Sequence, residues 1–257
     1  MQVYLIRIKP AERGIADSEA QTEVFCVQTR TLALETSGLS GSVAACDGGR
    51  LLAEHDLAVG QRSAQSLAPA LRKLLAEVGW QPRDVQCVAV TIGPGSFTGL
   101  RVGVTTAKTF AYATRAAVIG VDTLAVIAAQ APAEATRVAV ALDAQRREVF
   151  AAVYGPATMQ GRSLVEPARI VTVQAWLDSL TDDVWGSGPV LDKLAGVLPP
   201  GARPVAREFW HPRAATVARL AGAAFDRGQR DDIWQLVPNY LRRSAAEEKW
   251  DQRRKTT

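Results

Sequence analysis

The chain has 257 residues, of which 47% are hydrophobic and 22% are charged, and this composition excludes disorder as its main state. Domains commonly hold about 100 to 200 residues, so the length allows one large domain or two lobes. The sequence holds no uninterrupted apolar run of about 18 residues, which argues against a membrane-spanning helix. The first residues also lack the long apolar stretch of a secretory signal, and we therefore expect a cytoplasmic protein.

The number of cysteines and the net charge further restrict the classes of protein to which the chain can belong. Cys26, Cys46 and Cys87 are widely spaced and odd in number, which predicts reduced thiols rather than a disulfide framework or a Cys-x-x-Cys metal site. The formal net charge is +4, and residues 242–257 hold six Lys or Arg against three Asp or Glu. The rest of the chain is therefore nearly neutral. A basic tail on a neutral protein supports nucleic-acid binding only weakly, and the alternative is that the tail is simply solvated.

The first lobe is expected to follow an extension that lies outside the core, over residues 1–28. Its strands are expected over residues 31–35, 42–46, 50–57 and 85–92. Its two helices are expected over residues 66–78 and 100–114. The Asp47-Gly48-Gly49 sequence predicts a tight reversal between strands, because Asp-Gly and Gly-Gly accept the positive φ of hairpin turns. Ser66 is expected to cap the first helix, which places Pro69 in the first turn.

The second lobe repeats the opening of the first in outline. Its strands are expected over residues 137–143, 148–154 and 184–188, and its helices over residues 173–180, 190–197 and 213–227. Ala33-Leu-Glu35 and Ala141-Leu-Asp143 superpose directly, with an acidic residue ending the first strand of each copy. A duplicated lobe is the favoured interpretation, and a chance similarity of two hairpins is the alternative. We expect lobes over residues 29–121 and 122–245, then a basic tail over 246–257.

The least generic segment of the sequence covers residues 91–101, where a buried strand runs through a glycine-rich turn into a helix. Such a turn presents backbone N–H groups and the positive end of a helix dipole, which suit an anion. Gly93, Gly95 and Gly99 nevertheless do not fit the spacing of a Rossmann fingerprint, and no Gly-Lys pair completes a Walker A loop. Ser96 does not fit a nucleophile elbow, because Pro94 stands where that motif requires glycine.

The helix after this loop has one nearly bare stripe at four-residue spacing. The stripe consists of Gly99, Gly103, Ala107 and Ala111. It permits close backbone approach either to the chain's own sheet or to a helix of a partner subunit. For the second interpretation, the neighbouring contact residues on the preceding helix are expected to be Leu67, Leu71 and Leu74.

These motifs resemble the TsaB/YeaZ family of bacterial tRNA threonylcarbamoyladenosine biosynthesis proteins over about residues 31–250. The matching segments are residues 34–37, 42–44, 93–101, 120–124, 141–144, 148–149 and 238–242. The most specific match is the loop formed by Gly93, Pro94, Gly95, Ser96, Phe97, Thr98, Gly99 and Arg101. The chain departs from many relatives at Ser63, where they have histidine, and at Glu35, where they often have aspartate.

The resemblance implies an α/β fold of the actin/Hsp70-like (ASKHA) type, with two duplicated lobes built on mixed sheets. It implies an accessory subunit that pairs with a TsaD-type paralogue, which performs the transfer to N6 of adenosine 37 in tRNAs reading ANN codons. A TsaE-type ATPase joins this pair, so tRNA, ATP and magnesium are expected to be handled by the complex rather than by an intrinsic cofactor site. The resemblance assigns the pairing surface to the two helices of the first lobe, and a homodimer of the isolated chain is the alternative.

We expect no catalytic residue and no metal site in this chain. His55 and His211 are far apart in sequence and are expected to be a strand residue and a loop residue. Glu35, Thr36 and Asp143 are the candidate remnant of a nucleotide cleft, and the Ala144–Arg147 turn lacks the glycines of a phosphate loop. Two other functions stay open: an M22-type glycoprotease, and a direct tRNA-binding module that uses basic residues of the tail.

The basic residues expected to contact tRNA in the second alternative are Arg242, Arg243, Lys249, Arg253, Arg254 and Lys255.

Overall fold

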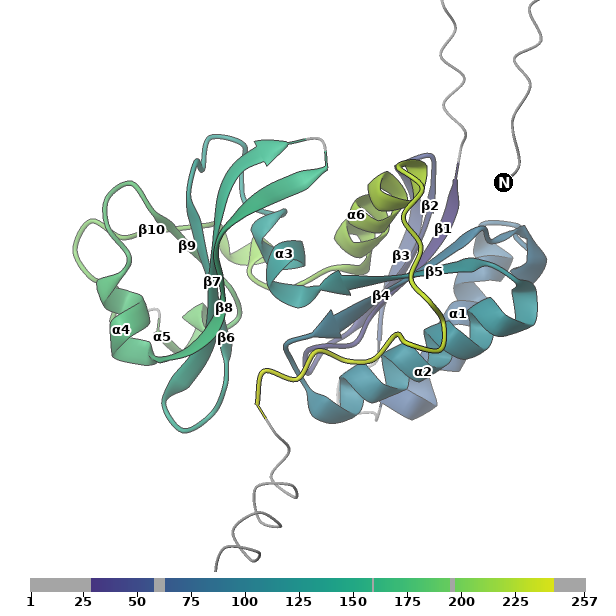
Figure 1. The fold of residues 1–257 in the computed structure, drawn as a ribbon, viewed down its shortest axis with the longest axis horizontal. Helices are drawn as coiled ribbons and strands as arrows, with labels where there is room; N and C mark the ends of the chain where they lie inside the picture. Colours follow the sequence, from purple (N-terminus) through teal and green to yellow (C-terminus); the bar gives the residue numbers. More distant parts are fainter. Residues whose placement is uncertain (1–28, 58–62, 159, 195–196, 243–257) are drawn as a thin grey trace, which may run out of the picture.

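The computed structural model describes residues 29–57, 63–158, 160–194 and 197–242, and Figure 1 shows two lobes side by side. The predicted extension over residues 1–28 and the predicted tail over 246–257 lie outside the described residues. Among the residues that the structure describes, no helix is long and apolar enough to cross a membrane.

The described residues form two five-stranded sheets, one in each lobe. The strands of the first sheet are β1 (Arg30–Glu35), β2 (Ser42–Asp47), β3 (Arg50–Asp56), β4 (Cys87–Gly93) and β5 (Ala117–Asp122). The strands of the second sheet are β6 (Val138–Asp143), β7 (Glu148–Thr158), β8 (Gly161–Thr172), β9 (Trp185–Ser187) and β10 (Arg203–Pro204).

The two sheets share one topology. The first has the order β3-β2-β1-β4-β5, in which β1 pairs antiparallel with β2 and parallel with β4. The second reads β8-β7-β6-β9-β10 from its other edge, with β6 antiparallel to β7 and parallel to β9. The strand order and the strand directions both repeat, so the predicted duplication and the actin/Hsp70-like two-lobed fold with mixed five-stranded sheets are confirmed. Glu35 and Asp143 end the equivalent strands β1 and β6, as expected.

Helices cover both faces of the first sheet. The described helices are α1 (Ser63–Glu77), α2 (Phe97–Thr114), α3 (Thr123–Ala128), α4 (Val173–Asp178), α5 (Leu191–Leu194) and α6 (Ala214–Asp226), with short 3-10 turns η1 (Pro82–Asp84) and η2 (Arg207–Phe209). Side chains alternate along β1, so Leu32 and Leu34 lie in the apolar cluster that includes α1 and α2. Ala33 faces the other way, toward the small side chains of α6.

Helix α6 corrects the predicted division of the chain. The helix expected over residues 213–227 is present, but it packs on β1, β2, β4 and β5 of the first lobe rather than in the second lobe. Ala214, Ala218 and Ala221 meet the small side chains of the first sheet, and this pairing permits close helix–sheet approach. The lobes are therefore discontinuous in sequence, and the range 122–245 does not form one lobe.

Helix α1 begins earlier than expected. It starts at Ser63 rather than after Ser66, so Pro69 lies inside the helix and not in its first turn. Buried Leu67, Leu71 and Leu74 hold the helix on the sheet, and this packing outweighs the hydrogen bond that proline cannot donate.

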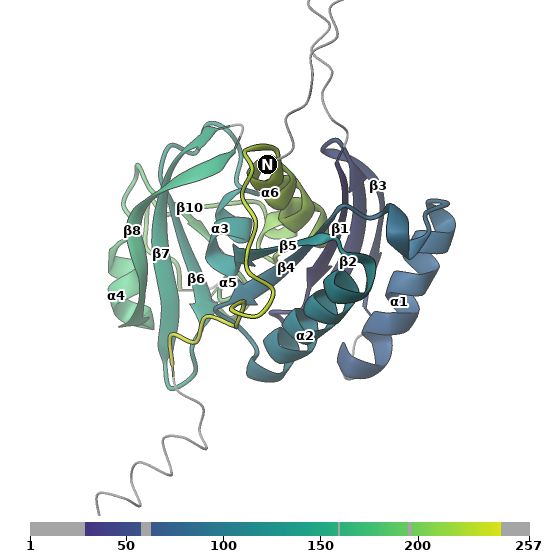
Figure 2. The same ribbon diagram turned by 45° about the vertical axis from the view of Figure 1, so that its right-hand side comes forward.

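The C-terminal strap, residues 229–242, runs from the end of α6 past β5 and α2 toward the second lobe (Figure 2). Asp231 pairs with Val118 beside β5, and Leu236 is buried in the apolar cluster of α1 and α2. Leu241 packs against the core of the second lobe, where Arg242 binds Glu148. The strap therefore contacts the cores of both lobes.

Candidate functional site

The segment after β4 folds into a compact connection to α2. The Gly93–Pro94 peptide is cis, and the backbone N–H of Ser96 donates to the carbonyl of Ser37 at 2.7 Å. The Ser96 hydroxyl accepts a hydrogen bond from the Gly99 N–H at 3.3 Å as the N-cap of α2. The hydroxyl thus stabilises the start of the helix, and the Ser96 and Gly99 N–H groups are already bonded within the chain.

The glycines of α2 permit close contact with the turn that follows β1. A Cβ atom at Gly99 would lie under 3.0 Å from the Thr36 carbonyl oxygen, and one at Gly103 would lie equally close to the Thr36 hydroxyl oxygen. Real Cβ atoms essentially never come this close to another heavy atom, so a side chain at either position would displace the turn. The bare stripe therefore packs on the chain's own sheet.

The structure corrects the expectation that these residues form an accessible partner surface. All seven residues are buried in the first lobe: Gly99, Gly103, Ala107, Ala111, Leu67, Leu71 and Leu74. The four-residue spacing marks a close packing contact, but the contact is intramolecular, which was the other interpretation of the pattern.

Glu35 is enclosed where β1 meets the motif loop. The side chain has no exposed surface, and its Oε1 accepts hydrogen bonds from the N–H (2.7 Å) and the hydroxyl of Ser37. The Thr91 hydroxyl lies at 3.5 Å from the same oxygen, while Oε2 is buried without a hydrogen-bond partner. Burial raises the pKa of Glu35 to about 7, against the lowering effect of the Ser37 and Thr91 hydrogen bonds. Thr36 beside it also has a buried hydroxyl without a partner.

Asp143, at the equivalent place in the second lobe, has a different environment. It is exposed, and its Oδ2 pairs with Lys193 Nζ at 2.5 Å while Oδ1 accepts from the Gln145 N–H at 2.7 Å. The hydrogen bond from Lys193 is the main cause that holds the pKa of Asp143 below its ordinary value. The carboxylate is therefore engaged by a lysine of α5.

The turn after Asp143 has an unusual backbone. Gln145, Arg146 and Arg147 have φ values of 63°, 55° and 60°, so three consecutive residues with large side chains lie in the left-handed region. Each such residue is disfavoured by about 1 kcal/mol or more and persists only where its surroundings fix it. The turn is fixed by the Asp143 hydrogen bond and by Arg242, which donates to the Ala144 carbonyl.

These residues do not fit a metal–nucleotide complex of the kind that the fold family implies. Glu35 presents no exposed oxygen, Asp143 is paired with Lys193, and long side chains occupy the turn where glycines would let phosphate approach the backbone. Among the described residues, no three His, Cys, Asp or Glu side chains converge as metal ligands.

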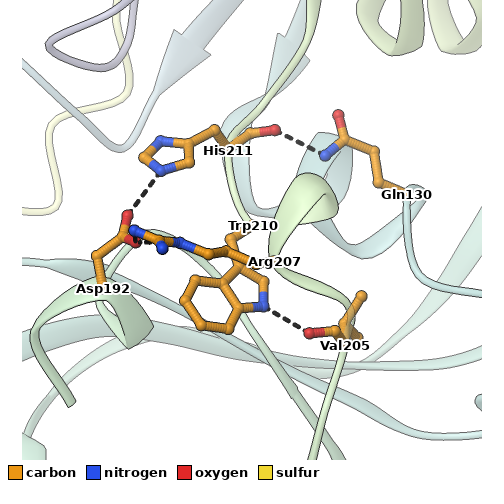
Figure 3. Close-up of polar contacts among 6 residues, drawn as sticks. All are labelled: Gln130, Asp192, Val205, Arg207, Trp210 and His211. Carbon is orange, nitrogen blue, oxygen red and sulfur yellow. Dashed lines mark hydrogen bonds and ion pairs between the residues drawn. The ribbon is translucent and has the colours of Figure 1, made fainter. Parts of the chain in front are cut away.

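Both histidines have carboxylate partners. His55 lies in β3 and its Nε2 is 2.6 Å from Glu77 of α1. His211 Nε2 is 2.8 Å from Asp192 Oδ2, and Arg207 binds the other Asp192 oxygen at 2.8 and 3.1 Å (Figure 3). The hydrogen bond from His211 is the first cause that lowers the pKa of Asp192, and the bonds from Arg207 add to it.

This Asp192 cluster, which the sequence analysis missed, fixes the segment that leads from the second lobe to α6. Gln130 Nε2 donates to the His211 carbonyl at 2.7 Å, and the buried Trp210 indole donates to the Val205 carbonyl at 2.6 Å (Figure 3). A hollow of about 100 Å³ lies beside it, where His211 and Arg213 of this segment face Ser40 and Asp56 of the first lobe. All of these contacts stabilise the connecting segment, and His211 lies in a loop, as predicted.

A wider depression of about 520 Å³ lies beside β5 and was also missed. Its lining includes Gly120, Asp122, Arg230 and Asp231, and the Asp231 carboxylate accepts from the Gly120 N–H at 2.7 Å. Asp122 caps α3 through the Ala125 N–H at 2.9 Å. Both acids are thus engaged in backbone contacts.

The chain is similar to several known proteins. The family model described as "TsaD: tRNA N6-adenosine threonylcarbamoyltransferase" matches residues 58–250. The tRNA threonylcarbamoyladenosine biosynthesis protein TsaB of Bacillus subtilis is 28% identical over 229 residues, which cover 85% of this chain and 96% of that protein. TsaB of Escherichia coli is 29% identical over 229 residues, with 84% and 96% covered.

Solved structures agree with these sequence relatives. A Pseudomonas aeruginosa protein described as having similarity to peptidase YeaZ superposes with a TM-score of 0.70 at 30% identity, covering 83% of this chain and 100% of that chain. YeaZ from the same organism superposes with a TM-score of 0.69 at 29% identity. The sequence identity, the near-complete coverage and the repeated sheet topology together show that this chain belongs to the TsaB/YeaZ family of tRNA threonylcarbamoyladenosine biosynthesis proteins.

Proposed function

We propose that this chain is an accessory subunit, without catalytic activity of its own, in the formation of threonylcarbamoyladenosine in tRNA. The role in this modification follows from its TsaB relatives, which it matches over 96% of their length. In the proposed complex a TsaD-type paralogue carries out the transfer to N6 of adenosine 37 in tRNAs reading ANN codons. The chain supports that paralogue by binding to it.

The observation that carries the non-catalytic part of the proposal is the state of the two cleft carboxylates. Glu35 is enclosed and presents no oxygen to a substrate, and the exposed Asp143 carboxylate is already paired with Lys193. The Ser96 hydroxyl is engaged as a helix cap, which argues against its use as the nucleophile of a glycoprotease. ATP and magnesium are therefore assigned to the partner subunits, the TsaD-type paralogue and a TsaE-type ATPase.

We propose that the partner contacts the outer face of α1 and α2. The two helices pack side by side on the first sheet (Figure 2). Their inner residues are buried, but Ala68 and Ala76 of α1 and Thr105 and Thr109 of α2 are exposed. These small side chains share the exposed side of the two helices with the longer Arg72 and Tyr112, and they leave places where another helical surface can approach. The same face can pair two copies of the chain when the paralogue is absent.

The experiment is size-exclusion chromatography with light scattering, using this protein alone and mixed with its TsaD-type counterpart. The wild-type chain is expected to form a complex, and Ala68→Trp is expected to prevent it because a bulky side chain obstructs a close helix contact. Ala175→Trp is the matched control, because Ala175 is an exposed alanine on α4 of the second lobe. Normal pairing by Ala68→Trp would remove this face from the proposal.

A further inference from the structure

The C-terminal strap lies alongside α2, and the two run in opposite directions (Figures 1 and 2). The rings of Trp234 and Tyr112 pack edge to face with their centroids 5.8 Å apart. Lys108 Nζ donates to two carbonyls of the strap at 3.4 and 3.1 Å, and Arg101 donates to the Tyr240 hydroxyl at 3.0 Å. The strap is therefore fixed against α2 from Trp234 to Tyr240.

Large apolar side chains are exposed along this contact. Tyr112 and Trp234 are each 69% exposed, Val237 is 63% exposed and Tyr240 is 39% exposed. Ten large hydrophobic side chains are exposed in the part of the chain that the structure describes, so four of the ten gather on one helix and the strap beside it. Apolar side chains that gather in this way mark an interaction site, whereas singly scattered ones do not. We call these four side chains the strap patch.

The patch stands on a backbone that other groups hold in place. Leu236 is buried in the apolar cluster of α1 and α2, and the Asn239 N–H donates to the Ile92 carbonyl at 2.6 Å. Trp234 and Val237 lie outside the three apolar clusters that the described residues form. Their side chains are therefore available for a partner, and a fixed backbone lowers the entropy that is lost when they bind one.

The helix beside the strap carries only positive charge. Arg101 and Lys108 lie in α2, Arg115 follows at its C-cap, and the helix contains no Asp or Glu. These three residues and Tyr112 share one side of the helix, because their spacing returns to the same face. Within the described ranges, none of the three cations forms an ion pair with a carboxylate. Residues 233–242 of the strap hold no acid either.

The two acids that precede the patch in the strap are engaged by the backbone. Asp231 accepts from the Gly120 N–H and Asp232 from the Trp234 N–H, both at 2.7 Å. A complementary partner surface therefore combines apolar side chains with acidic ones. RNA fits less well, because bases stack on ring faces, whereas this patch includes the aliphatic Val237 and two rings that meet at 66°.

We infer that the strap patch and the cations of α2 form a docking surface for a segment of the TsaD-type partner in which acidic residues accompany apolar ones. The inference rests on the proposed function, and it extends the proposed contact from the outer face of α1 and α2 to the strap, since Tyr112 belongs to both. Trp234 is the expected main contact, because tryptophan, tyrosine and arginine side chains dominate the affinity of protein interfaces.

The test measures the affinity of the full-length chain for its TsaD-type partner by isothermal titration calorimetry. Trp234→Ala is expected to weaken pairing about tenfold or more. Val237→Glu is expected to weaken it about tenfold more than Val237→Lys, because only the glutamate repels an acidic partner segment. Raising the salt concentration from about 50 to about 300 mM is expected to weaken pairing of the wild type. Urea unfolding of each variant is expected to match the wild type, since both positions are largely exposed.

Leu164→Ala is the matched control, because Leu164 is 57% exposed on β8 of the second lobe and its replacement is expected to leave pairing unchanged. Equal affinities of Trp234→Ala and Leu164→Ala would overturn the inference, and equal affinities of Val237→Glu and Val237→Lys would overturn the acidic partner segment. Intact pairing of Trp234→Ala with loss of self-association, or of binding to an RNA hairpin, would assign the patch to a second copy or to RNA instead.

The same titrations separate this inference from the proposed function. If Ala68→Trp prevents pairing and Trp234→Ala does not, the docking surface on the strap is wrong and the proposed contact through α1 and α2 stands. If the wild-type chain does not pair with the TsaD-type partner at all, the proposed function is wrong as well.

Discussion

Glu35→Gln removes the buried carboxyl at the end of β1 while keeping its shape. In the folded chain the carboxyl is fully enclosed, and burial raises its pKa from the ordinary value of 4.5 to about 7. The folded state therefore retains the proton over a pH range in which the unfolded chain has already lost it. Stability falls as pH rises through this range, because ionisation is easier in the unfolded chain.

The size of the effect follows from the two pKa values. Their difference corresponds to about 3 kcal/mol, since one pH unit between them is worth about 1.4 kcal/mol. Below the ordinary value the carboxyl is protonated in both states, and wild type and Glu35→Gln should be equally stable. Above about pH 7 wild type carries the full penalty, so Glu35→Gln should be more stable by up to about 3 kcal/mol.

Urea unfolding at about pH 5 and about pH 8 measures this difference. The matched control is Glu134→Gln, because Glu134 is an exposed residue before β6 and its replacement should change stability little at either pH. If Glu35→Gln exceeded wild type in free energy of unfolding by the same amount at both pH values, the conclusion that Glu35 is enclosed and protonated would be wrong.

Two further predictions concern the packing of the motif segment. Gly103→Ala should destabilise the chain by about 1 to 3 kcal/mol in urea unfolding, because the new methyl group would displace the buried hydroxyl of Thr36; unchanged stability would show that the stripe is loosely packed. Tyr240→Ala should lower stability by about 1 to 2 kcal/mol and speed proteolysis of the C-terminal strap, because it removes the ring stack on Phe97 and the hydrogen bond to Arg101. A strap equally resistant in both proteins would contradict that role.

The sequence predicted the elements whose signals are local. Alternating apolar residues and turn sequences located β1, β2 and β3, and the internal repeat of Ala-Leu-acid located β6. Strands β5 and β8 and the short helix α3 were not predicted. Edge strand β8 has mostly exposed or half-exposed side chains and therefore lacks the apolar run of a central strand.

The stripe of α2 shows what spacing alone leaves undetermined. Glycine or alanine at every fourth position indicates that one helix face permits close approach, but it does not say what approaches. Gly103 faces Thr36 and the chain's own β4, while exposed Thr105 and Thr109 lie on the outer side of the same helix. Helix α6 follows the strands of the second lobe in the chain, and this position likewise does not indicate that it packs on the first sheet.

The sequence located the two acids of the candidate site but did not predict the burial of one or the ion pair of the other. The acids ending β1 and β6 were located from the repeat, yet Glu35 is enclosed in the fold, where its contacts are with Ser37 and with Thr91 of β4. The pairing of Asp143 with Lys193 joins residues 50 positions apart, which no local pattern indicates. The Asp192–His211 contact was missed for the same reason.

The most direct test of the account is formation of threonylcarbamoyladenosine on unmodified tRNA by purified components. The account predicts no product from this chain alone, and product when it is combined with the TsaD-type paralogue, the TsaE-type ATPase, ATP and a threonylcarbamoyl donor. It also predicts loss of product when only this chain is left out. Modified tRNA formed by the isolated chain, or full activity of the remaining components without it, would contradict its role as an accessory subunit.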